Sequence, residues 1–124
     1  VSVATQLLRL PAALLLDEPT SGLDSTSALV LVQILNTLAH RAGFTVVMTI
    51  HQPRNEIYAL FDQLTILVAG DIIYSGPPQQ STKHFGITKV EQNIGNEILD
   101  KLSKSTNDEI QAYRKAYAEG PLGA

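Results

Sequence analysis

The sequence predicts an α/β fold with a parallel sheet, because two short apolar segments flank one helical segment. Residues 12–16 (AALLL) lie between Pro11 and Pro19, a span too short for a helix, and predict a fully buried strand. Residues 44–50 (FTVVMTI) are apolar, continuous and rich in β-branched side chains, and predict a second buried strand. A strand, a helix and a strand in succession form a βαβ unit, so we expect the two strands to be parallel.

The segment between the strands, residues 25–43, has the periodicity of an amphipathic helix. Asp24 or Ser25 provides an N-cap, and Gly43 provides the stop. The apolar positions fall on one stripe, which comprises Ala28, Leu31, Leu35, Leu38 and Ala39. This stripe is expected to pack against the sheet.

The rest of the chain predicts a hairpin and several short helices. Residues 65–68 (TILV) and 72–75 (IIYS) are the expected strands of the hairpin, joined by a tight turn at Gly70 and Asp71. His84 is expected to be a surface residue. Short or amphipathic helices are expected at residues 2–10, 53–61, 79–85, 96–102 and 110–118.

Composition excludes several classes of protein. With 124 residues, 44% hydrophobic and 17% charged, the chain suits one globular domain or a piece of a larger one. A net charge of -3 argues against a nucleic-acid-binding surface. The chain has no cysteine, and its three histidines lack metal-ligand spacing, which excludes a disulfide framework and a zinc site. No apolar run approaches the ~20 residues that a membrane-spanning helix needs.

Three polar residues follow the two predicted strands and are candidates for a site. Asp17 and Glu18 end the first strand and His51 follows the second, so all three are expected at one rim of a parallel sheet. Asp17 could hold magnesium directly or through its water, Glu18 could deprotonate a water, and His51 could donate to a phosphate. Taken alone, an acidic pair after a strand is more often a solvated turn, and a histidine such as His51 is more often a capping residue beside Pro53.

Longer stretches of sequence resemble a known family. Residues 14–25 (LLLDEPTSGLDS) resemble the Walker B motif and D-loop of ATP-binding cassette (ABC) ATPases. Residues 49–54 (TIHQPR) resemble the switch-histidine region of the G subfamily of ABC transporters, and residues 60–85 resemble that subfamily as well. Beyond them the resemblance thins, because residues 93–103 (NIGNEILDKLS) stand where the family usually has an Asn-Pro-Ala-Asp-Phe-like stretch.

The resemblance implies specific roles and a specific fold. The fold would be a fragment of a parallel-sheet, P-loop NTPase-type ABC ATPase core, with a β-hairpin and C-terminal helices. Asp17 would serve magnesium through water, Glu18 would be the catalytic base, and His51 would contact the γ-phosphate of ATP. Ser21 and Asp24 would act in nucleotide binding and communicate across a dimer of two cassettes. The implied cofactors are ATP and Mg²⁺.

The resemblance also implies a domain plan and partners. Residues 1–85 would be the C-terminal part of a nucleotide-binding domain, and residues 86–124 a helical extension or linker. The chain contains no Walker A sequence, because no lysine follows a glycine, and no signature motif, so we expect it to be inactive alone. Its partners would be a second half-transporter or cassette, in a homodimer or heterodimer, and a transmembrane domain of the same chain, with no nucleic acid.

The implied function is ATP-driven export of lipids, sterols or hydrophobic compounds, from a position on the cytosolic face of a membrane. Two alternatives stay open. A soluble ABC-type ATPase acting on ribosomes or DNA would share the acidic pair, although it would be expected to have basic surfaces. A catalytically degenerate cassette would bind nucleotide without hydrolysing it.

Overall fold

A computed structural model describes residues 12–89 and 93–120 of the chain. Within it the chain divides between Leu60 and Phe61 into two compact units, which are described separately below. The helix expected at residues 2–10 lies outside the described residues. The assignment of residues 1–85 to one domain and 86–124 to an extension rests on the family resemblance and stays a prediction.

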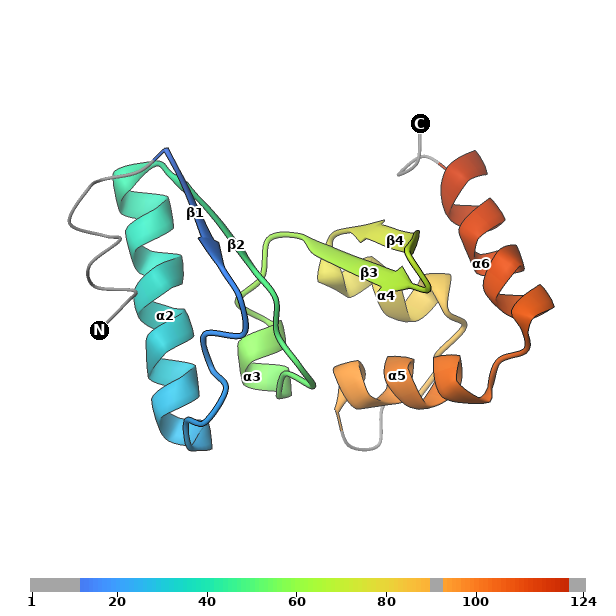
Figure 1. Cartoon of the computed structure of the whole chain (residues 1–124), viewed down its shortest axis with the longest axis horizontal. Coiled ribbons are helices and arrows are strands. Elements are labelled where there is room, and N and C mark those ends of the chain that lie inside the picture. The colour runs from blue at the N-terminus through green and yellow to red at the C-terminus, as the bar shows by residue number, and fades with distance from the viewer. Residues whose placement is uncertain (1–11, 90–92, 121–124) are drawn as a thin grey trace. The chain divides into compact units, whose positions relative to one another are not determined.

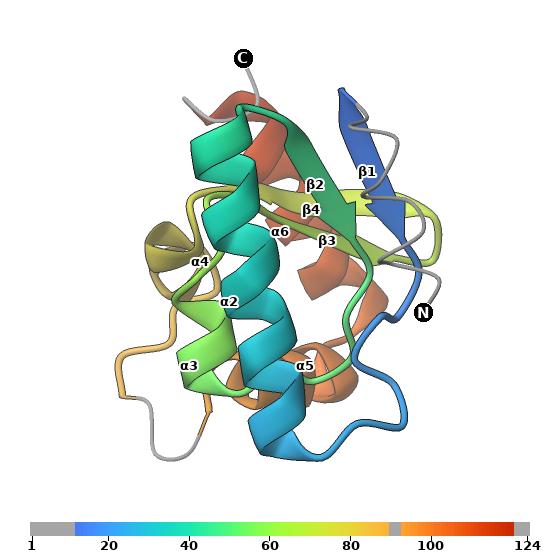
Figure 2. The same ribbon diagram turned by 90° about the vertical axis from the view of Figure 1, so that its left-hand side faces the viewer.

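The first unit contains the predicted βαβ arrangement. Strand β1 (Ala13–Leu16) is followed by helix α2 (Ser25–Ala42), strand β2 (Thr45–Met48) and the short helix α3 (Asn55–Tyr58). The two strands pair in parallel, and α2 lies along one face of the small sheet that they form (Figures 1 and 2). The prediction of parallel strands joined by a helix is therefore confirmed.

Helix α2 begins and ends at the residues that its sequence predicts. Asp24 is the N-cap, and its Oδ2 accepts hydrogen bonds from the backbone amides of Thr26 (3.1 Å) and Ser27 (3.2 Å). At the other end Gly43 adopts φ 73°, a left-handed conformation that glycine adopts without a steric penalty, and its N–H bonds the carbonyl of Ala39. The side chain of Asn36 donates to the carbonyl oxygen of Leu60 (2.7 Å), which fastens α2 to the residues after α3.

Both strands are buried on one face only, so the prediction of fully buried strands is wrong. Leu14 and Leu16 pack with Leu35 of α2, whereas Leu15 is 70% exposed and Val47 of β2 is 54% exposed. Successive side chains of a strand point to opposite faces, and α2 covers only one of them. On α2 the fully buried residues are Ala28, Val32 and Leu35, so Val32 joins the predicted stripe and Leu31 lies at its edge.

The second unit is a hairpin with three helices. Its strands are β3 (Leu64–Val68) and β4 (Asp71–Gly76), which pair antiparallel. Helices α4 (Pro78–His84), α5 (Ile94–Lys104) and α6 (Asn107–Glu119) follow, with α4 and α6 in contact with β4 (Figure 1). The hairpin and the three C-terminal helices were expected, although each helix begins earlier than its apolar pattern suggests.

The turn of the hairpin lies one residue earlier than predicted. Asp71 pairs with Val68, so Ala69 and Gly70 form the two-residue connection, with φ 51° and 86°. Positive φ at both central residues is the geometry of a type I′ turn, whose twist matches that of the strands. Only one of these two positions is a glycine. A single glycine does not show whether the residue before it or the one after it shares the turn.

The second unit is held together by a cluster of aromatic rings. Tyr74 of β4 and Phe85 are fully buried, and His84 lies between them and Tyr113 of α6. The Nε2–H of His84 donates to the carbonyl oxygen of Ile73 (2.9 Å). His84 is half-buried, so the expectation of a surface histidine is wrong. Its ring joins α4 to the hairpin and to α6.

Helix α2, at 18 residues the longest in the described part of the chain, carries charged and polar positions among its apolar ones. Across residues 12–89 and 93–120, the structure has no helix both long enough and apolar enough to cross a bilayer.

Candidate functional site

The acidic pair lies at the carboxyl end of β1, as the sequence predicts. The register pairs Leu16 with Met48, and the amide of Thr49 donates to the carbonyl oxygen of Leu16 (3.0 Å). The next residues along both strands, Asp17 and Thr49, are therefore neighbours at the rim of the sheet. The side chains of Asp17 and Glu18 are exposed there, which leaves them accessible to a ligand.

Thr49 connects the two acidic residues, and the sequence analysis did not single it out. Its hydroxyl donates to Oδ1 of Asp17 (2.5 Å) and accepts a hydrogen bond from the backbone N–H of Glu18 (2.8 Å). One hydroxyl can serve both bonds, because it has one donor and two acceptor positions. The clue in the sequence was a polar residue directly after the apolar residues 46–48, just as Asp17 directly follows the apolar residues of β1.

The backbone at this rim is strained in two places. Glu18 adopts φ 44° and Gln52 φ 48°, both in the left-handed region that residues other than glycine seldom occupy. Such a residue costs about 1–3 kcal/mol, and residues of this kind concentrate at functional sites. One strained residue, Glu18, is a member of the acidic pair, and the other follows the end of the neighbouring strand.

Two consecutive turns lead from Glu18 to helix α2. The amide of Ser21 donates to the carbonyl of Glu18 (3.0 Å), and the amide of Leu23 donates to that of Thr20 (3.2 Å). Gly22 has φ 78°, which the second turn requires at its third residue. Ser21 is therefore fixed by its backbone in an exposed loop close in sequence to Glu18.

His51 lies two residues beyond Thr49 in the loop after β2. It is exposed, and within the described residues its side chain makes no hydrogen bond to Asp17 or Glu18. The structure thus joins the acidic pair to Thr49 and places His51 nearby along the chain, without a direct bond between them. The proposed contact of His51 with a phosphate stays a prediction.

Asp24 has a clear structural function as the cap of α2. Hydrogen bonds from the Ser27 side chain, the Ser27 amide and the Thr26 amide lower the pKa of its carboxyl group below the ordinary value. These bonds favour the ionised form, so the folded state gains stability above the ordinary pKa of about 3.9. The predicted role of Asp24 across a dimer interface stays a prediction.

The cap gives a prediction about pH. Because the pKa of Asp24 is lower in the folded state, its contribution to stability is lost as the pH falls from about 4 through that lowered value. An Asp24→Asn variant keeps a cap oxygen but does not titrate, so its urea midpoint should fall less than that of the wild type over this range. Circular dichroism at a series of pH values measures both curves, and parallel curves would contradict the prediction.

The donor groups at the rim fit a hydrated magnesium ion. No cluster of three or more acidic, histidine or cysteine side chains suited to a metal occurs in residues 12–89 and 93–120. Magnesium does not need one, since it commonly binds through one or two carboxylates, several waters and the phosphates of a nucleotide. Asp17 is an exposed carboxylate of this kind, with one oxygen already oriented by Thr49.

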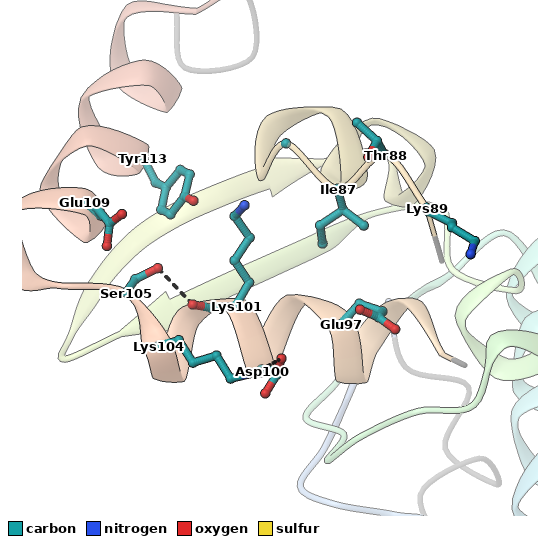
Figure 3. A pocket seen from close by; sticks show the side chains of 11 residues that line it. Ile87, Thr88, Lys89, Glu97, Asp100, Lys101, Lys104, Ser105, Glu109 and Tyr113 are labelled. Carbon is teal, nitrogen blue, oxygen red and sulfur yellow. Dashed lines mark hydrogen bonds and ion pairs between the residues drawn. The ribbon is translucent and has the colours of Figure 1, made fainter. Parts of the chain in front are cut away.

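A pocket in the second unit is a different feature. It has a volume of about 410 Å³ and lies between α5, α6 and the turn after α4, with Lys101 reaching into it from α5 (Figure 3). Some of its charged groups already have partners: Lys104 pairs with Asp100 (2.7 Å), and Glu109 accepts the N–H of Thr106 (2.7 Å). None of the predicted site residues lines this pocket, so it is not the candidate site.

Comparison with known proteins agrees with the motifs. No family model matches the chain. ABC transporter G family member 13 of Arabidopsis thaliana is 51% identical over 86 residues, which are 69% of this chain and 12% of that protein. ABC transporter G family member 21 of the same plant is 50% identical over 116 residues, 90% of this chain and 17% of that protein. Human ATP-binding cassette sub-family G member 5 is 47% identical over 85 residues, 68% of this chain and 13% of that protein.

The names of these three relatives agree with one another. All three are ABC proteins by name, and all three carry the G designation. The chain belongs to the G family of ABC transporters. It spans less than a fifth of the length of each of these three relatives.

Proposed function

We propose that this chain is part of the ATP-binding and hydrolysing domain of an exporter that couples ATP hydrolysis to transport across a membrane. The observation that carries the proposal is the rim of the parallel sheet, where Asp17 and Glu18 are both bound to Thr49. A fixed acidic pair at the carboxyl end of a parallel strand suits a nucleotide site. We place the βαβ unit in a P-loop NTPase-type core on the strength of the family.

Each residue at the rim has a proposed role in hydrolysis. Asp17 would hold Mg²⁺ through water, and the ion would neutralise charge on the phosphates of ATP. Glu18 would orient the attacking water and take its proton, a function that needs an accessible carboxylate. His51 would donate a hydrogen bond to the γ-phosphate, and Ser21 and Asp24 would communicate with a second cassette.

The cargo and partners follow from the family and are part of the proposal. The two plant relatives are named as transporters, which supports transport over the alternative of an ATPase that acts on ribosomes or DNA. We propose lipids, sterols or other hydrophobic compounds as cargo. We further propose a transmembrane domain in the full-length protein, a second half-transporter as the dimer partner, and a location at the cytosolic face of a membrane.

Reconstitution of the full-length protein tests this function. Membrane vesicles that contain it should hydrolyse ATP in the presence of Mg²⁺ and should accumulate a labelled sterol or phospholipid only when ATP is supplied. A matched preparation with ADP in place of ATP is the control. ATP turnover that depends on added ribosomes or DNA, with no transport, would contradict the proposal and favour the soluble alternative.

The 124-residue chain by itself is expected to show no Mg²⁺-dependent ATP turnover. A phosphate-binding loop of the form G-x-x-x-x-G-K-[ST] supplies backbone amides and a lysine to the phosphates, and this sequence contains none. The measurement is phosphate release from ATP by the purified chain, compared with a blank without protein. Turnover above that blank which requires Mg²⁺ would contradict the expectation.

A further inference from the structure

We propose that Thr49 is a positioning residue for hydrolysis, whose hydroxyl sets the geometry of both acidic residues at once. The inference rests on the proposed function, because it assigns Thr49 a role toward Asp17 and Glu18 in that reaction. It concerns a residue that touches neither nucleotide nor water in the proposed scheme and acts through the two carboxylate residues that do.

The first effect of Thr49 is on Asp17. Its hydroxyl donates a hydrogen bond to Oδ1 of Asp17 at 2.5 Å. The bond orients the carboxylate through one oxygen, while Oδ2 makes no hydrogen bond in the described part of the chain. An oriented carboxylate with one open oxygen is suited to accept a hydrogen bond from a metal-bound water.

The second effect of Thr49 is on Glu18. The same oxygen accepts the backbone N–H of Glu18 at 2.8 Å, and Glu18 is the residue in the left-handed conformation. A strained conformation persists only where its surroundings hold it. The backbone conformation of Glu18 sets the direction of its Cα–Cβ bond. The hydrogen bond to Thr49 holds that conformation and so directs the Glu18 carboxylate relative to Asp17.

Threonine suits this position better than other hydroxyl-bearing residues. Its β-branch restricts χ1, so fewer rotamers are lost when the hydroxyl forms the two bonds. The parallel register places it beside Asp17, because the amide of Thr49 is bound to the carbonyl of Leu16. The backbone of Thr49 is thus held by the sheet. Its hydroxyl, through its two hydrogen bonds, holds the loop that carries the acidic pair.

The test compares Thr49→Val, Thr49→Ser and Thr45→Val in the full-length protein. Valine has the shape of threonine without the hydroxyl, and serine keeps the hydroxyl. Thr45 is an exposed threonine at the start of β2, four residues before Thr49. We expect Thr49→Val to lower kcat for ATP hydrolysis by about 10–100-fold with little change in KM, since loss of a group that orients a metal ligand has effects of this size. Thr49→Ser should recover most of the activity, and Thr45→Val should match the wild type.

Two readouts besides turnover accompany the kinetics. In a Glu18→Gln background, adding Thr49→Val should raise the Mg²⁺ concentration needed for half-maximal binding of a fluorescent ATP analogue by about 10-fold or more. Amide hydrogen exchange should be faster at Glu18 in Thr49→Val than in Thr45→Val, because the partner of that N–H is gone. Exchange in β1 and α2 should not change, which separates positioning from loss of folding.

The outcomes distinguish this inference from the proposed function. Wild-type kinetics and Mg²⁺ dependence in Thr49→Val, together with loss of turnover in Glu18→Gln, would overturn the role of Thr49 and leave the proposed function in place. Equal loss in Thr49→Val and Thr49→Ser with faster exchange throughout the first unit would also overturn it, since that pattern is a folding defect. Full turnover in Glu18→Gln would overturn both.

Discussion

Replacement of Glu18 by glutamine should lower the ATP turnover of the full-length protein by about 10²–10⁴-fold, the range that a general base contributes. Glutamine has nearly the same shape as glutamate but cannot take a proton from water. The backbone N–H that bonds Thr49 remains, so the geometry of the loop should be preserved. Steady-state phosphate release with saturating ATP and Mg²⁺ measures the effect.

Binding of ATP provides the companion measurement for Glu18→Gln. The variant should bind a fluorescent ATP analogue about as tightly as the wild type, because the proposed role of Glu18 is in the chemical step. Glu56→Gln is a matched control, since Glu56 is an exposed glutamate of the same unit, in the first turn of α3. A comparable loss of turnover in both variants would contradict the assignment of the base.

Replacement of Leu14 by alanine should lower the free energy of unfolding by about 2–5 kcal/mol, the usual effect of removing a buried leucine side chain. Leu14 is 2% exposed and packs with Leu16 and Leu35 between the sheet and α2. Urea unfolding of the 124-residue chain, followed by circular dichroism, gives the value.

The neighbouring residue supplies the control for this prediction. Leu15 has the same side chain on the same strand but faces away from α2 and is 70% exposed. Leu15→Ala should therefore change the free energy of unfolding by about 0.5 kcal/mol or less. Equal losses in the two variants would contradict the one-sided burial of β1 and support two covered faces.

The βαβ unit could be predicted because each of its parts depends on local sequence. Asp24 and Gly43 mark the ends of α2 through bonds made within a few residues, and both residues act as predicted. The position of the acidic pair after β1 follows from the end of an apolar run. Each of these features depends on residues that are close together in the sequence, so composition and spacing are sufficient to find them.

The burial of the strands could not be predicted in the same way. A continuous apolar run indicates what a strand is able to bury, but only its neighbours decide whether one face or both are covered. Leu15 and Val47 are apolar and yet exposed, because α2 lies on the opposite face. The hairpin turn could not be located for a similar reason. Its position at Ala69 and Gly70 follows from the pairing of Asp71 with Val68, which is a contact between strands.

The contacts of Thr49 with the acidic pair depend on the register between β1 and β2, which cannot be read from the sequence alone. A shift of one residue between β1 and β2 would exchange the side chains that meet Asp17. The motif drew attention to His51, whereas the residue that bonds both acidic neighbours is two positions earlier. Prediction of that bond requires knowledge that Leu16 pairs with Met48.

The open face of the small sheet has a consequence for handling the chain in the laboratory. Leu15 and Val47 form an exposed apolar surface, and in the described part of the chain the sheet has only two strands, so each has an outer edge without a strand partner. Apolar surfaces and unpaired strand edges are the features through which polypeptides aggregate. Refolding of the 124-residue chain therefore competes with self-association, and the yield of monomer depends on how dilute the chain is while it folds.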